Sequence, residues 1–262
     1  MAKLSVLVPI FNEERHLEPV MEALLTSPCP IDREWIVIDD GSSDQSLAIL
    51  KRLAQRHPLQ IFKQTTNQGK GSAIARGVRE ATGDFVMIQD ADFEYDPLDI
   101  PTMLQPLLEG KADVVFGSRF KKSGHQVHRT YHYFINRFLT MLSNLLSGIY
   151  LTDMETCYKV FRTDLIKSMS LRSRRFGIEV ELTAYIAKVR ARIHEVPISY
   201  RPRNRLQGKK IGWKDGFAAL WHLIYFNLMV PKERAYCSLP RKYDPVAVET
   251  RYATPIESDR SV

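Results

Sequence analysis

Residues 85–94 decide the fold, and they read Phe-Val-Met-Ile-Gln-Asp-Ala-Asp-Phe-Glu. Four apolar residues are followed almost at once by three carboxylates at alternate positions, Asp90, Asp92 and Glu94. A short run that is apolar throughout predicts a strand buried on both faces. Because alternate side chains of an extended backbone point the same way, we expect the three carboxylates to face one site.

The first half of the chain repeats this pattern of a buried strand that ends in polar residues. We expect strands at residues 4–10, 35–38, 61–62, 85–88 and 114–116, with helices between them. Such alternation predicts an α/β fold with a mainly parallel central sheet and helices on both faces. Ligands of these sheets bind beyond the carboxyl ends of the strands. Four polar clusters are therefore expected to converge on one crevice: FNEE at 11–14, DDGSSD at 39–44, QDAD at 89–92 and GSR at 117–119.

The second half is less regular. We expect helices at residues 131–150, 179–190 and 216–230 and a strand at 193–200. The first and last of these helices are broadly apolar and flanked by lysine and arginine. They either lie on a membrane surface or are buried in the core or a dimer interface. Residues 231–262 contain four prolines and no periodicity, which predicts a polar, poorly ordered tail.

Charge and composition exclude several classes of protein. The net charge is +7, but residues 1–118 carry −7 and residues 119–262 carry +14, which suggests one half for a metal or donor and one for an anionic partner. Three distant cysteines, Cys29, Cys157 and Cys237, argue against a disulfide framework. The N-terminus lacks the pattern of a secretion signal, and no apolar run reaches the roughly 18 residues that cross a bilayer. We therefore expect a reduced protein on the cytosolic side.

Two common ligand classes are disfavoured by the motifs that are missing. No G-x-G-x-x-G follows the first strand, so a nicotinamide cofactor is not expected. No nucleic-acid fold signature is present, and an acidic crevice would repel a polyanion, so no nucleic acid is expected.

Three motifs carry the chemistry, each with a simpler alternative. The carboxylates at 90–94 would repel one another without a cation, and Mg²⁺ or Mn²⁺ suits such oxygen ligands. In the alternative interpretation they form an acidic loop that caps the helix near Pro97. Asp39 and Asp40 can accept hydrogen bonds from ribose hydroxyls or a base N–H, or cap the helix beginning near Ser43. The loop Gly69-Lys70-Gly71 is similar to a phosphate cradle, although the P-loop spacing is absent.

Taken together and in order, five motifs resemble family 2 glycosyltransferases: VPIFNE at 8–13, VIDDGSSD at 37–44, NQGKGSA at 67–73, QDADFEYDP at 89–97 and GSRF at 117–120. The resemblance covers roughly residues 4–215 and implies the nucleotide-sugar-binding fold called GT-A, with an Asp-x-Asp metal motif. Within the family the chain is most similar to the dolichyl-phosphate mannosyltransferase and polyprenyl-phosphate glycosyltransferase branch. In that branch the third position of the metal motif is often Gln, whereas here it is Glu94, which leaves the metal preference open.

The resemblance also implies roles for individual residues. The nucleotide would be lined by Pro9, Phe11, Glu13 and Asp40. The donor and a divalent metal, Mg²⁺ or Mn²⁺, would be served by Asp90, Asp92 and Glu94, of which Asp92 and Glu94 are the direct ligands. Donor or acceptor phosphates would be met by Arg119, Arg129, Arg201 and Lys209. The implied catalytic set is Asp90, Asp92, Arg119 and Glu155. Asp153 or Glu155 is a general base, a group that positions the acceptor, or a salt-bridge partner.

The implied reaction is an inverting, metal-dependent transfer of a hexose from GDP-mannose or a UDP-sugar to a dolichyl or undecaprenyl phosphate. We expect residues 1–230 to form one GT-A domain, with a nucleotide-sugar and metal half at 1–118 and an acceptor and membrane-facing half at 119–230. The protein would sit on the inner face of the membrane, docked directly or through a membrane-protein partner. One alternative is a hydroxyl acceptor on a glycolipid or polysaccharide, with Asp153 or Glu155 as base. Another is a non-catalytic sugar-nucleotide-binding adaptor.

Overall fold

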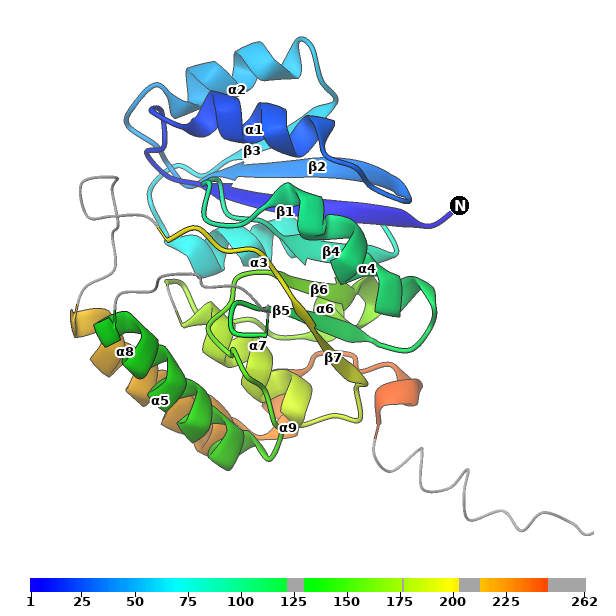
Figure 1. The fold of residues 1–262 in the computed structure, drawn as a ribbon, viewed down its shortest axis with the longest axis vertical. Coiled ribbons are helices and arrows are strands. Elements are labelled where there is room, and N and C mark those ends of the chain that lie inside the picture. Colours follow the sequence, from blue (N-terminus) through cyan, green and yellow to red (C-terminus); the bar gives the residue numbers. More distant parts are fainter. Residues whose placement is uncertain (122–129, 176, 203–212, 245–262) are drawn as a thin grey trace, which may run out of the picture.

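The computed structural model describes residues 1–121, 130–175, 177–202 and 213–244 (Figure 1). Within these residues one seven-stranded sheet has the order β3-β2-β1-β4-β6-β5-β7. All neighbouring strands pair in parallel except β6, which is antiparallel to both β4 and β5. The expected α/β fold with a mainly parallel sheet is confirmed. The strands are β1 (Lys3–Ile10), β2 (Asp32–Asp39), β3 (Leu59–Lys63), β4 (Phe85–Ile88), β5 (Val114–Ser118), β6 (Lys159–Arg162) and β7 (Ile193–Pro197).

Helices cover both faces of the sheet, which explains why its strands are apolar throughout. Side chains alternate between two cores: in β1, Val6 and Val8 face one core while Leu7 faces the other. The first core is closed by α1 (Leu17–Thr26), α2 (Ser46–Ala54) and α4 (Ile100–Leu108), which follows the short helix η1 (Pro97–Asp99). The second is closed by α3 (Lys70–Glu80), α6 (Thr163–Ser168) and α7 (Ile178–Ala187).

Two further helices form an outer layer beyond α7. They are α5 (Thr130–Ser147) and α8 (Trp213–Ile224), and α8 continues as the π-helix η3 (Tyr225–Met229). They run side by side and pack on α7 (Figure 1). As a result α7 lies between the sheet and this outer layer, and every residue from 178 to 186 is buried.

Two features differ from the sequence predictions. The strand β6 and the helix α6 are not predicted, because β6 has only four residues and begins and ends with the charged Lys159 and Arg162. The polar tail expected to begin at residue 231 is packed on the domain as far as Asp244, through α9 (Lys232–Ala235) and η4 (Arg241–Tyr243). The side chains of Tyr236 and Tyr243 are buried, and the backbone of Tyr236 also forms an isolated bridge with Met169. For residues 231–244 the expectation of poor order is therefore wrong.

One buried carboxylate, that of Glu34 in β2, ties the centre of the sheet together. It accepts hydrogen bonds from Lys3 Nζ (2.8 Å) and Ser5 Oγ (2.6 Å) in β1, and from the backbone N–H of Thr82 (2.7 Å) ahead of β4. Burial alone would raise the pKa of Glu34, but these bonds favour the charged form and lower the pKa from 4.5 to about 2.

A group whose pKa falls on folding stabilises the folded state above its unfolded pKa and loses that contribution as the pH drops. We predict that Glu34→Gln lowers the free energy of unfolding at pH 7 by about 3 kcal/mol. The difference from the wild type should shrink as the pH falls from about 4.5 toward about 2. Urea unfolding at a series of pH values measures it, and a difference that stays constant down to pH 3 would contradict the assignment.

Candidate active site

The polar clusters that follow β1 and β2 lie together at the carboxyl edge of the sheet. The side-chain oxygen of Asn12 accepts the backbone N–H of Ser43 (2.9 Å), and the backbone N–H of Glu13 donates to Ser46 Oγ (3.0 Å). Asn12 has a φ of 52°, a left-handed conformation that asparagine tolerates better than most residues. The partly exposed Phe11 and Glu13 belong to this turn and Pro9 lies near the end of β1, so all three are at the edge predicted for the nucleotide.

Asp40 fixes the loop that leads into α3. Its carboxylate accepts the backbone N–H groups of Gln68 (2.8 Å) and Gly69 (2.7 Å) and the side-chain amide of Gln64 (3.0 Å). Burial raises the pKa of Asp40 above its ordinary value, and these bonds oppose the rise. The neighbouring Asp39 accepts the backbone N–H of Ser42 (3.1 Å). Both aspartates therefore shape loops, and neither caps α2, which begins at Ser46 with Gln45 as its N-cap and no side-chain cap hydrogen bond. The nucleotide role of Asp40 stays a prediction.

Asp90 pairs with a lysine rather than standing open in the crevice. Lys70 Nζ lies 2.8 Å from Asp90 Oδ1 and 3.0 Å from Oδ2. The same ammonium contacts Glu179 Oε1 of α7 (3.1 Å) and Cys157 Sγ (2.7 Å). Burial by itself would lower the pKa of Lys70, but Asp90, Cys157 and Glu179 hold it well above the ordinary value. The lysine of the supposed phosphate cradle is thus the centre of a buried charge cluster.

The segment after β4 bends, so the three carboxylates do not alternate as in a strand. Residues 91–94 form a series of bends, stabilised by a hydrogen bond from the backbone N–H of Glu94 to Asp92 Oδ1 (2.9 Å). Glu94 Oε2 accepts the hydroxyl of Tyr200 (2.9 Å). The segment therefore lacks the extended geometry that was expected of it, and a site shared by the three carboxylates stays a prediction. Among the described residues, no group of three or more His, Cys, Asp or Glu side chains is arranged to hold a metal ion.

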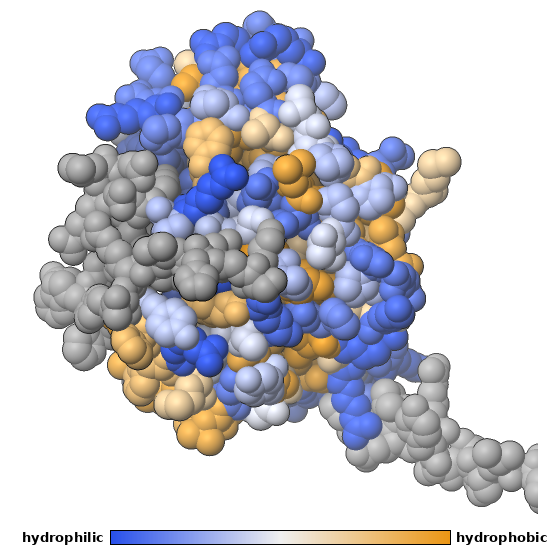
Figure 2. Space-filling model, viewed as in Figure 1, coloured by the Kyte–Doolittle hydropathy of each residue, from blue (hydrophilic) through white to orange (hydrophobic). Residues whose placement is uncertain are grey.

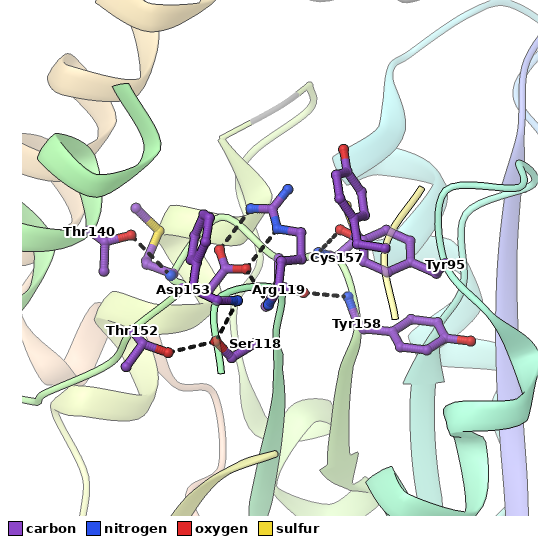
Figure 3. Close-up of polar contacts among 12 residues, drawn as sticks. Tyr95, Ser118, Arg119, Thr140, Thr152, Asp153, Cys157 and Tyr158 are labelled. Carbon is purple, nitrogen blue, oxygen red and sulfur yellow. Dashed lines mark hydrogen bonds and ion pairs between the residues drawn. The ribbon is translucent and has the colours of Figure 1, made fainter. Parts of the chain in front are cut away.

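Arg119, just after β5, forms a two-point ion pair with Asp153 (Figure 3). Its Nε and one terminal nitrogen each lie 2.7 Å from an oxygen of Asp153, and its backbone N–H donates to the same carboxylate (3.0 Å). Asp153 is fully buried, and the guanidinium also lies over the ring of Tyr200, 5.1 Å from its centre. Of the three roles open for Asp153, the structure supports the salt-bridge partner.

Glu155 differs from Asp153 in having no such partner. It is half-buried, and its Oε1 is one of the buried side-chain atoms without a hydrogen-bond partner in the described part of the chain. Burial and repulsion by Glu179 raise the pKa of Glu155 to about 7. Close by, the buried ammonium of Lys159 donates to the carbonyl oxygens of Met154 (3.0 Å) and Thr156, so the loop 153–158 wraps around it. Glu155 is thus a carboxyl group poised to change charge near neutral pH.

Comparison with known proteins identifies the family. The model of the family described as glycosyl transferase family 2 matches residues 5–169, more than half of the chain. The chain belongs to glycosyl transferase family 2.

Two curated relatives resemble this family 2 chain over most of its length. A dolichol-phosphate mannosyltransferase of Pyrococcus furiosus is 27% identical over 216 residues, which are 80% of this chain and 60% of the relative. A dodecaprenyl-phosphate galacturonate synthase of Rhizobium johnstonii is 28% identical over 208 residues, 77% of this chain and 60% of the relative. The chain thus spans only about three fifths of the length of each of these relatives.

Solved structures confirm the GT-A fold. A glucosyl-3-phosphoglycerate synthase of Mycobacterium tuberculosis, in complex with Mn²⁺, UDP-glucose and glycerol 3-phosphate, superposes with a TM-score of 0.66 at 19% identity. The match covers 88% of this chain and 82% of that one. The same enzyme is also known in complex with Mg²⁺ and UDP. At 19% identity, this similarity supports the fold alone.

Of the remaining predicted residues in this family 2 domain, only Arg201 lies in the part of the chain that the structure describes. Arg201 is 82% exposed, with its guanidinium 3.9 Å from Asp96, while its backbone N–H donates to the carbonyl oxygen of Glu94 (2.8 Å). Arg129 and Lys209 lie outside the described residues. All three cysteines are unpaired, which agrees with the absence of a disulfide framework.

The sequence analysis missed residues that support this edge of the family 2 domain. Glu179 is one of them, and the sequence does contain a pattern that points to it. Two glutamates inside an otherwise apolar helix must be paired if that helix is buried. Tyr95, Tyr158 and Tyr200 are others. The rings of Tyr95 and Tyr158 stack at 4.8 Å, the ring of Tyr200 lies 5.5 Å from that of Tyr95, and the hydroxyl of Tyr95 accepts the backbone N–H of Cys157 (3.0 Å). Isolated tyrosines in a sequence give no sign of such a cluster.

Proposed function

We propose that the chain transfers a hexose, with inversion at the anomeric carbon, from a nucleotide-sugar to a polyprenyl phosphate. The observation that carries this proposal is an exposed apolar face on α5 and α8, beside the loop that bears Asp153 and Glu155. A lipid acceptor needs such a surface next to a polar site. The two curated relatives, named for transfer involving dolichol phosphate and dodecaprenyl phosphate, support the same acceptor class.

The outer helix α5 holds that loop directly. Thr140 Oγ1 accepts the backbone N–H of Met154 (3.2 Å), and a guanidinium nitrogen of Arg137 donates to the carbonyl oxygen of Thr152 (3.1 Å). Asn144 bonds both the N–H and the carbonyl of Leu151. An acceptor whose hydrocarbon lies along α5 would therefore present its head group to this loop.

The charge balance of the crevice argues for a divalent cation with the donor. Lys70 and Arg119 are each neutralised by carboxylates, so neither offers net positive charge to a nucleoside diphosphate. Asp92 and Glu94 supply hard oxygen ligands, and Mg²⁺ commonly binds one or two carboxylates together with substrate phosphates. These residues fit a shared metal site completed by the donor, and they would hold Mg²⁺ or Mn²⁺. When bound, the ion stabilises negative charge on the departing diphosphate.

We predict that Asp92→Ala abolishes measurable transfer and that EDTA does the same to the wild type, with recovery on adding Mn²⁺ or Mg²⁺. The physical reason is the uncompensated diphosphate charge. The measurement is transfer from radiolabelled UDP-glucose or GDP-mannose to a short polyprenyl phosphate. Circular dichroism checks that the variant is folded. Full activity in EDTA, or wild-type activity of Asp92→Ala, would refute the metal proposal.

A second possible function differs from the first in the acceptor, which is a hydroxyl group and not a phosphate. A phosphate is already ionised and needs no base, and Asp153 is locked to Arg119, which favours the phosphate acceptor. A carboxyl with a pKa of about 7, that of Glu155, instead suits a general base for a hydroxyl acceptor on a glycolipid or polysaccharide. With a phosphate acceptor the neutral form of Glu155 has a different use, because it avoids repelling the anion.

We predict that Arg201→Ala lowers turnover with polyprenyl phosphate by about tenfold to hundredfold, through loss of a charge-assisted phosphate contact. Glu155→Gln, which mimics the neutral acid, should cost less than tenfold. The measurement is turnover with a short polyprenyl phosphate and with the matching free alcohol. Three results together would instead support the base mechanism. Glu155→Gln would lose turnover by on the order of 10²–10⁴-fold, the alcohol would be the better acceptor, and the rate would fall as the pH drops through about 7.

The apolar face has the character of a membrane-docking surface. On α5, Phe134, Phe138, Met141 and Leu145 recur every three or four residues and are exposed, Leu145 by 79%. Trp221, Ile224 and Leu228 continue the surface on α8 and η3, and Figure 2 shows the apolar patch over this layer. No described helix is both long and apolar enough to span a bilayer.

Charge selects an anionic bilayer as the occupant of this face. In the sequence, the segments 121–129 and 201–214 that lead into α5 and α8 carry nine lysines and arginines and no acidic residue. Basic residues next to an apolar helix face favour anionic headgroups. We therefore place the enzyme on the inner face of the membrane, docked through α5 and α8.

We predict that the wild type co-sediments with vesicles that contain phosphatidylglycerol and binds phosphatidylcholine vesicles at least tenfold more weakly. Phe138→Glu/Leu145→Glu should weaken binding to the anionic vesicles at least tenfold, because two large apolar groups no longer enter the interface. Leu108→Glu, on the opposite side of the sheet and 40% exposed, is the matched control and should bind as the wild type does. If this face instead forms a dimer or binds a membrane-protein partner, the wild type should co-sediment with neither kind of vesicle.

A further inference from the structure

The ammonium of Lys70 joins four segments that are far apart in the sequence. It lies at the first residue of α3 and contacts Asp90 after β4, Cys157 before β6 and Glu179 in α7. The thiol of Cys157 in turn donates to Glu179 Oε1 (3.4 Å). Only 14% of the Lys70 side chain is exposed, and its ammonium is engaged by these three side chains.

Lys70 contacts both oxygens of Asp90, at 2.8 and 3.0 Å, which fixes how far that carboxylate can rotate. It also supplies the positive charge between Asp90 and Glu179. The orientation of Asp90 therefore depends on Lys70.

The backbone around Lys70 is held from two sides. Asp40 binds the N–H of Gly69 (2.7 Å), and the N–H of Ser72 donates to the carbonyl oxygen of Arg174 (3.2 Å). A Cβ at Gly69 or Gly71 would meet the backbone of residues 173–174 at 2.3 or 2.1 Å, so only glycine permits this approach.

The opposing segment is fixed as well. The buried carboxylate of Glu181 accepts the backbone N–H groups of Arg172 (2.7 Å) and Ser173 (2.8 Å). Two buried glutamates of α7 thus act on the same point: Glu181 holds the segment against the glycine loop, and Glu179 holds the lysine. The loop aims Lys70 at Asp90 with little freedom.

We propose that Lys70 is a positioning residue of the donor site, which holds the Asp90 carboxylate in the orientation that the nucleotide-sugar needs, and that Glu179 holds Lys70 in turn. This inference rests on the proposed function, because Asp90 acts on the donor only if a nucleotide-sugar binds here. It assigns no contact between Lys70 and the substrate.

The test is a double-mutant cycle read by binding. Affinities for UDP and for GDP, each with Mn²⁺, are measured by calorimetry for the wild type, Lys70→Met, Asp90→Asn and the double variant. We expect Lys70→Met to bind the preferred nucleotide tenfold to hundredfold more weakly. In the Asp90→Asn background the same change should have less than a threefold effect, because its target is already altered.

Three controls separate positioning from general stability. Lys70→Arg, which keeps the charge, should recover part of the affinity, and Glu179→Gln should lower it less than Lys70→Met does. Lys3→Met removes a comparable ion pair to the buried Glu34 far from the crevice, and it should lower the melting temperature without changing nucleotide affinity. Lys70→Met alone leaves the carboxylate of Asp90 without its ammonium partner, which could itself disturb folding. The double variant removes both charges and so controls for that effect.

The outcomes are distinct. Wild-type affinity in Lys70→Met, or equal losses in both backgrounds, overturns the positioning role and leaves the proposed function intact. A wild type that binds neither UDP nor GDP with Mn²⁺ overturns the proposed function and this inference with it.

Discussion

The need to pair buried charges organises this structure. The helix α7 lies between the sheet and the outer helices, yet it carries Glu179 and Glu181, and a buried carboxylate without partners is costly. Glu179 therefore meets Lys70 from the start of α3, and Glu181 meets two backbone N–H groups of the segment before α7. These contacts bring the glycine loop, the carboxylates after β4 and the loop before β6 to one place.

The same constraint divides the crevice into two kinds of charged group. Arg119 and Asp153 neutralise each other, as do Lys70 and Asp90, so these pairs provide shape more than net charge. Oε1 of Glu155 has no hydrogen-bond partner among the residues that the structure describes, and burial and repulsion by Glu179 raise the pKa of Glu155 to about 7. The groups with paired charges thus shape this edge of the sheet, and in the proposed function the chemistry depends on Glu155 and on ions brought by the donor.

The position of α7 also explains the outer surface. Because α7 occupies the face of the sheet, α5 and α8 pack on α7 and have no further layer outside them among the described residues. Their outward side chains include Phe138, Met141 and Trp221, which in a monomer would face water. A large exposed apolar face of this kind marks an interaction surface. Its attachment to the loop 151–155 through Thr140 and Asn144 couples that surface to the crevice.

The sequence by itself determined the alternation of strands and helices in the first half, the clusters at the strand ends and the family, because these depend on local periodicity and on short motifs. It also marked Asp90, Asp92, Arg119 and Glu155. Only the tertiary structure decided that β6 enters the sheet antiparallel, that Asp40 holds a loop, and that residues 231–244 pack on the domain. It alone paired Lys70 with Asp90 and Glu179, and Arg119 with Asp153. The physical reason is that an ion pair forms only where the fold brings two distant segments side by side. The sequence shows the charge of each residue, but that charge is the same whichever partner the residue meets.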